Sequence, residues 1–187
     1  GVALKVTIPD VVTSARPLWS SDQPALEPLS HVGGGVAVEF REDRGHVAIL
    51  ELAGDYDFLD ASGAANLAAR EAVAAEFYAT HPDAFDFLFV ATSFPVDLGA
   101  SVRARHVGVR NDVAGIGLPI LDNTELYGSQ GQLQSFIDLG ALASYGLETP
   151  STDLDHALTI AVHEMLHRWA ARVRYRRAGG EISSDLV

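Results

Sequence analysis

The chain has 187 residues and is 48% hydrophobic, which suits one globular domain with a substantial core. Its formal net charge of −12 argues against nucleic acid as the main partner, because phosphate binding normally needs a basic face. Cysteine is absent, which excludes disulfides, cysteine zinc sites and thiol catalysis. No apolar run approaches about 18 residues and no secretion signal is visible, so we expect no membrane span.

The first part of the chain is predicted to be an extended arm. Residues 1–35 carry four prolines and end in the Gly33-Gly34-Gly35 run, with one strand expected at Leu4–Ile8. We therefore place the compact domain at residues 36–187.

The domain is predicted to open with a hairpin and a helix. Strand-like runs at Val36–Phe40 and His46–Leu52 flank the charged segment Arg41–Gly45, which we interpret as a solvated turn. Ala61–Thr80 is rich in Ala, Leu and Glu and predicts a helix that closes at His81-Pro82.

The next segments predict further strands around a long loop. Phe85–Ala91 and His106–Arg110 have the aromatic and β-branched pattern of buried strands. Asn111–Gly131 is dense in Gly, Asn, Asp and Ser and is predicted to be an irregular rim of a cleft. Leu133–Leu142 fits neither period cleanly, and we favour a strand over a short helix.

The clearest helix is expected from Asp153 to about Arg177. Thr152 and Asp155 form a capping pair at its start, and Gly179-Gly180 stop it. Several arginines crowd its last part, and we interpret them as a solvated helix end: Arg168, Arg172, Arg174, Arg176 and Arg177.

This helix contains an H-E-x-x-H sequence at His163–His167. Residues at i and i+4 share one helix face about 6 Å apart, so both imidazoles can bind one zinc ion at about 2.0 to 2.1 Å. The carboxylate of Glu164 can then take a proton from a water molecule and deliver it to a leaving amine. Zn2+ is therefore the predicted cofactor, with His163 and His167 as ligands and Glu164 as the catalytic base.

Two imidazoles one turn apart can also be ordinary buried histidines. The motif, however, specifies three residues on a well-capped helix, and apolar neighbours are expected to exclude bulk water from it: Val162, Met165, Leu166 and Trp169.

The motif on a helix after strands and an earlier helix resembles the zincin superfamily of metallopeptidases. The resemblance covers the catalytic half and implies a mostly parallel sheet, an active-site helix below it and a substrate-aligning edge strand above the cleft. The expected fold class is α/β, in the α+β sense: a zincin-like twisted mixed sheet with a long active-site helix packed against it. The run His163–Trp169, H-E-x-x-H-x-W, is also similar to that of gluzincin aminopeptidases.

A catalytic zinc site normally needs a third protein ligand. Ala170 and Val173 stand where the metzincin pattern requires Gly and His. Glu181 begins an E-x-x-S-D run that resembles thermolysin-like enzymes, so it ranks first within the chain. Asp185 would instead resemble the aspzincins, and a ligand beyond Val187 is an equal alternative.

The transition-state oxyanion in this chemistry is usually met by a donor from Tyr, His or Arg as well as zinc. Tyr127, Tyr145 and His156 are the candidates, since they lie before the motif in or near the adjoining segments. His31, His46, His81 and His106 have no ligand spacing and are interpreted as structural.

The predicted function is hydrolysis of peptide bonds in a peptide or protein substrate by a zinc metallopeptidase. By analogy with most such peptidases, a secreted or cell-surface location is expected. The main alternative is a non-catalytic module of a larger surface or secreted protein with an incomplete metal site. An aminopeptidase is a further alternative, which would need an acidic residue for the free amine of the substrate.

Overall fold

The computed structural model describes residues 2–6, 32–33, 35–116, 118–145, 152–169, 175–176 and 182–183. Its helical elements are α1 (Leu67–Thr80), η1 (Thr124–Tyr127), η2 (Leu142–Tyr145), α2 (Thr152–Leu166) and η3 (His167–Trp169). Its strands are β1 (Val2–Val6), β2 (Val32–Gly33), β3 (Val36–Arg44), β4 (Val47–Ala53), β5 (Phe87–Thr92), β6 (Arg105–Gly108), β7 (Arg110–Asn111), β8 (Leu121–Asp122), β9 (Ser135–Ala141), β10 (Tyr175–Arg176) and β11 (Ile182–Ser183).

The centre of the molecule is a mixed sheet of seven strands in the order β2-β3-β4-β1-β5-β9-β6. The four central strands, β4, β1, β5 and β9, run parallel to one another. Strand β6 pairs antiparallel with β9 and forms one edge, while β3 pairs antiparallel with β4 towards the other. The apolar composition of β5 and β9 suits central strands, because both faces of such strands are covered.

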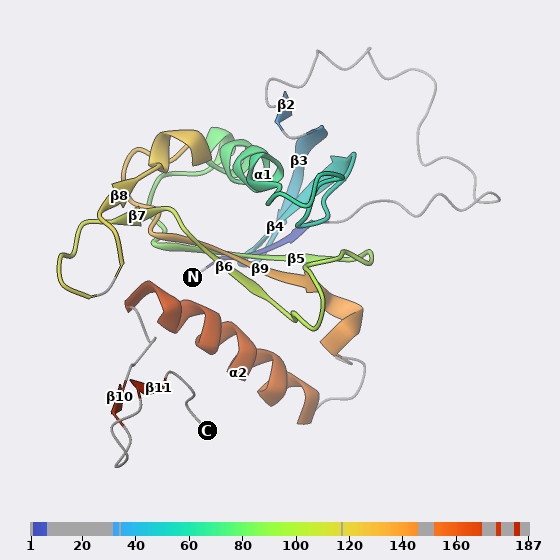
Figure 1. The fold of residues 1–187 in the computed structure, drawn as a ribbon. Coiled ribbons are helices and arrows are strands. Elements are labelled where there is room, and N and C mark those ends of the chain that lie inside the picture. The colour runs from blue at the N-terminus through green and yellow to red at the C-terminus, as the bar shows by residue number, and fades with distance from the viewer. Residues whose placement is uncertain are drawn as a thin grey trace, which may run out of the picture.

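The two α-helices lie on opposite faces of this sheet (Figure 1). Helix α1 contacts β3 and η1, whereas α2 contacts β9, β6 and η2. Successive side chains of a strand alternate between these faces. Phe136 of β9 packs with Tyr127 on the α1 face, so the following residue, Ile137, belongs to the α2 face. His106 of β6 pairs with Ile137 and shares that face.

The main hydrophobic core fills the space between α1 and the sheet. Val73 and Phe77 of α1 are fully buried there against apolar side chains of β3, β4, β5 and β9. A buried ion pair crosses the same layer, with Arg70 of α1 donating from Nη2 to Asp138 Oδ2 at 2.8 Å. Both side chains are completely buried, and Arg70 Nη1 also donates to the carbonyl oxygens of Asp57 and Asn66.

The mixed sheet packed against helices confirms the coarse fold class, but several boundaries differ from the prediction. Strand β3 continues to Arg44, so the segment Arg41–Gly45 is mostly strand and the turn is at Gly45 and His46. Helix α1 begins at Leu67 rather than Ala61. Gly63 adopts a φ of 81° before it, a conformation that breaks a helix.

The C-terminal helix is shorter than the sequence predicts. Helix α2 ends at Leu166 and is followed by the 3-10 turn η3, and Tyr175–Arg176 pair with Ile182–Ser183 instead of extending the helix. The prediction of one long active-site helix reaching Arg177 is therefore wrong. At Tyr175 and Arg176, strand pairing overrides helical propensity.

The prediction of an N-terminal arm is corrected at its start. Strand β1 lies between β4 and β5 in the centre of the sheet, so residues 2–6 belong to the compact domain. Val2–Val6 also begins two residues before the strand that we expected at Leu4–Ile8. Among the described residues, no helix has the length and apolar character needed to cross a membrane.

Candidate metal centre

The three motif residues converge on one point at the carboxyl end of α2. His163, Glu164 and His167 each offer one ligand atom, and these atoms lie within 4.8 Å of one another. The two imidazole centroids are 4.9 Å apart with the rings at 90°. Tetrahedral binding at about 2.0 to 2.1 Å puts ligand atoms about 3.4 Å apart, which small side-chain rotations can supply. These three side chains are therefore a group that could hold a metal ion.

The position of Glu164 suits a base beside such an ion. Its Oε2 atom lies 4.0 Å from His167 Nε2, and its side chain is only 12% exposed. The pKa of Tyr145 is raised to about 12, chiefly by burial and further by the negative charges of Asp138 and Glu164. The Glu164 side chain is thus mostly buried, while His163 is exposed.

The structure adds His106 to this region, although its sequence position predicts a purely structural residue. Its ring centroid lies 5.8 Å from that of His167, and its Nε2 is 2.9 Å from the hydroxyl of Ser135. No local spacing signals this neighbour, because β6 and α2 are far apart in the chain. Only the pairing of β6 with β9 and the packing of α2 below them bring the two histidines together.

The site is more open than the sequence predicts. Met165 is half-buried, but Val162, Leu166 and Trp169 are exposed, with Trp169 at 53%. These three side chains therefore do not form the expected apolar shield within the described residues. Trp169 does contact the sheet, since its ring centroid is 5.8 Å from that of Phe87.

The candidate transition-state donors have three different surroundings. Tyr127 packs into the core on the α1 face, opposite α2, and cannot reach the motif. The Tyr145 hydroxyl lies near the motif helix but is 2.8 Å from Leu139 O and 3.0 Å from Arg103 O, so it is engaged with the backbone. His156 is exposed near the start of α2, 3.4 Å from Arg103 Nη1. The predicted role therefore fails for Tyr127.

The candidates for a third ligand, Glu181 and Asp185, lie outside the described residues. The prediction that Glu181 completes the site accordingly stays a prediction.

One member of the arginine cluster is not solvated. Arg168 is 4% exposed and donates to Gln134 Oε1 at 2.8 Å and Asn111 Oδ1 at 3.1 Å. The interpretation of Arg168 as part of a solvated helix end is therefore wrong. The segment predicted as a rim, Asn111–Gly131, does begin beside the motif, because Arg168 directly follows His167.

Comparison with known proteins gives no relative: no family model, no curated protein and no solved structure matches this chain. The arrangement of these residues is therefore the basis of any functional argument.

Proposed function

We propose that the protein is a zinc-dependent metallopeptidase of the zincin type. The observation that carries this proposal is the convergence of His163, Glu164 and His167 at the end of a helix packed against β9 and the antiparallel edge strand β6. His163 and His167 would hold the metal ion. A third protein ligand is part of the proposal, with Glu181 ranked first within the chain.

When bound, the zinc ion supplies Lewis-acid chemistry that makes a water molecule a better nucleophile. Glu164 accepts the proton of that water and delivers it to the leaving amine, and its small exposed fraction favours such proton transfer. The substrate peptide lies along β6, because an edge strand can add an extended chain by backbone hydrogen bonds. A secreted or cell-surface location is proposed only by analogy with such peptidases.

Zinc content and Glu164→Gln together test this proposal. Elemental analysis is expected to find about one zinc per wild-type chain and none in His163→Ala, since a catalytic site of this class holds one ion. Glu164→Gln is expected to keep its zinc and to lose peptide hydrolysis by about 10² to 10⁴-fold, the usual contribution of a general base. Full activity in Glu164→Gln would contradict the proposed mechanism.

A non-catalytic module is the second candidate, and the exposure of His163, Val162 and Leu166 favours it. In that case the site would bind metal weakly or not at all. Cleavage of a general peptide library that stops on addition of a chelator would exclude this alternative. Comparing peptides with free and blocked N-termini would then separate an aminopeptidase from an endopeptidase.

A further inference from the structure

Arg168 links the end of the motif helix to the residue before β9 and to the end of β7. Its Nε donates to Gln134, just before β9, and its Nη1 donates to Asn111 at the end of β7. Nη2 lies 3.7 Å from Asp112 Oδ1. A guanidinium has a planar fork of donors, so one side chain can serve several acceptors at once.

The side chain of Asn111 also forms hydrogen bonds with the loop that follows β7. Its Oδ1 accepts from Arg168 Nη1 and also from Val113 N, at 3.1 Å in each case. Its Nδ2 donates to Pro119 O at 2.8 Å and to Val113 O at 3.3 Å. The buried side chain of Asn111 therefore holds both ends of this loop and the end of the helix.

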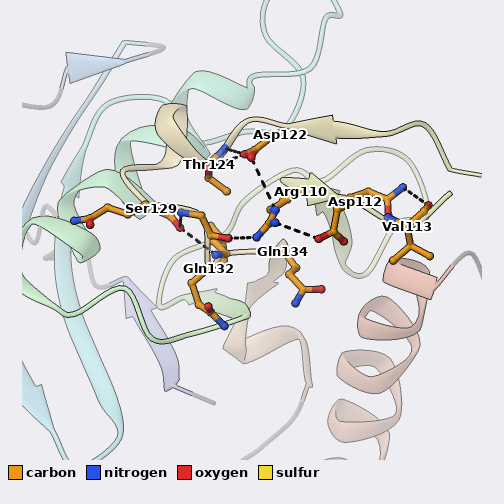
Figure 2. Close-up of polar contacts among 12 residues, drawn as sticks. Arg110, Asp112, Val113, Asp122, Thr124, Ser129, Gln132 and Gln134 are labelled. Carbon is orange, nitrogen blue, oxygen red and sulfur yellow. Dashed lines mark hydrogen bonds and ion pairs between the residues drawn. The ribbon is translucent and has the colours of Figure 1, made fainter.

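A second arginine holds the same loop from the other side. Arg110 Nη2 lies 3.1 Å from Asp112 Oδ2, and its Nη1 donates to Gly131 O. Asp112 is thus placed between Arg110 and Arg168. Figure 2 shows Arg110, Asp112 and Gln134 close to one another, with Asp112 and Val113 on the side nearest the helix. We refer to Arg110, Asn111, Asp112, Gln134 and Arg168 as the arginine clamp.

The clamp acts at the C-terminal end of the motif helix. The last turn of a helix lacks part of its backbone hydrogen bonding and opens more readily than the middle. His167 begins η3, directly after the last residue of α2. A metal ligand must be held within about 0.5 Å of its binding geometry, so this turn needs support from tertiary contacts. Arg168 is the next residue and makes such contacts.

We propose that Arg168 is a positioning residue for the metal centre, which fixes the turn carrying His167 and couples metal binding to the order of the loop after Asn111. This inference rests on the proposed function, because it assumes that His167 is a ligand. Coupling is reciprocal, so metal binding must also stabilise the loop. A side chain that merely stabilised the fold would not transmit that effect.

The affinity test uses the full chain with zinc as the probe, measured by competition with a chromophoric chelator. Arg168→Met is expected to weaken zinc binding by about 10 to 100-fold, as much as the loss of a hydrogen-bond partner of a ligand, because the turn that carries His167 is then no longer held. The zinc affinity of Arg168→Lys should lie between those of the wild type and Arg168→Met, because an ammonium group cannot reproduce the planar set of guanidinium donors. The matched control is Arg103→Met, which removes an exposed arginine near the other end of α2 and should leave the affinity unchanged. Wild-type affinity in both Arg168 variants would overturn the inference.

Hydrogen exchange then tests the coupling itself. Zinc is expected to slow amide exchange in residues 109–116 of the wild-type chain but not of Arg168→Met. In metal-free protein, Arg168→Met should exchange faster than wild type in both 109–116 and 163–169. The inference would be overturned if zinc did not change exchange in residues 109–116 of the wild type and if metal-free Arg168→Met exchanged there at the wild-type rate. A wild-type chain that takes up no zinc would overturn the proposed function instead, and the metal-free comparison would still decide whether Arg168 holds the loop.

Discussion

Tyr145 is a buried residue whose hydroxyl joins two segments of the sheet side of the molecule. The residue is buried at the end of η2, and its hydroxyl reaches the backbone oxygens of Arg103 and Leu139. It therefore bridges the segment before β6 and strand β9. Burial raises its pKa to about 12, because the charged phenolate loses its hydration there.

This raised pKa predicts a loss of stability in alkaline solution. The neutral form is favoured in the folded chain, so the contribution of Tyr145 is complete below about pH 10, the ordinary value for tyrosine. It is lost as the pH rises from there through about 12, the folded value. Tyr145→Phe should cost about 1 kcal/mol at neutral pH through the lost hydrogen bonding.

Urea denaturation of both chains over this pH range checks the prediction. The difference in unfolding free energy between wild type and Tyr145→Phe should shrink as the pH rises from about 10 to about 12, because phenylalanine does not titrate. A difference that stays constant across the range would contradict it.

At the scale of elements, the close approach of η1 to α1 depends on one glycine. Gly128 ends η1 with a φ of 72°, and a Cβ placed there would lie 2.8 Å from the Cα of Ala75. Such a distance is shorter than real Cβ contacts allow. The glycine therefore serves both the left-handed backbone and the packing of the two elements.

The chain offers a control that separates these two roles. Gly115 also has a left-handed backbone, with a φ of 85°, but a Cβ there would meet nothing within 4 Å. Gly115→Ala should cost about 1 to 2 kcal/mol for the backbone conformation alone. Gly128→Ala should cost a further 1 to 3 kcal/mol or so, because it also forces η1 away from α1. Equal costs in urea denaturation would show that η1 moves freely.

At the scale of the whole molecule, the Arg70–Asp138 pair ties α1 to the sheet through the buried layer. The guanidinium also lies 4.2 Å from the centroid of the Tyr56 ring. Burial raises the pKa of Asp138, and the charge of Arg70 opposes that effect. The desolvation cost of each buried charge is therefore offset by its partner.

Breaking this pair should destabilise the fold strongly. Asp138→Leu is expected to cost about 3 to 5 kcal/mol, because Arg70 is left buried without its carboxylate. The double variant Arg70→Met with Asp138→Leu should recover most of that loss, since an apolar pair has no desolvation cost. Urea denaturation measures both effects.

The exposed pair of Arg44 and Glu42 provides the control for this experiment. Arg44→Met should change the unfolding free energy by less than about 1 kcal/mol, as is usual for surface ion pairs. A double variant no more stable than Asp138→Leu alone would mean that the pair itself is not what holds the layers together.

Local pattern predicted much of the sheet in advance. The strands at Val36 and Phe87 and the end of α1 at Thr80 follow from runs of apolar residues and from the closing His81-Pro82. The H-E-x-x-H spacing likewise brings His163, Glu164 and His167 together, because one helical turn separates the two histidines. These features depend only on neighbours in the chain.

Tertiary structure decided the features that depend on distant contacts. The central position of β1 and the burial of Arg168 both depend on partners far away in sequence. The position of His106 beside His167 also depends on distant contacts, as does the position of Tyr127 on the α1 face of the sheet, opposite the motif helix. Residue spacing determines which side chains share a helix face or a strand face. Strand order and helix packing determine what those faces meet, and no local period encodes that information.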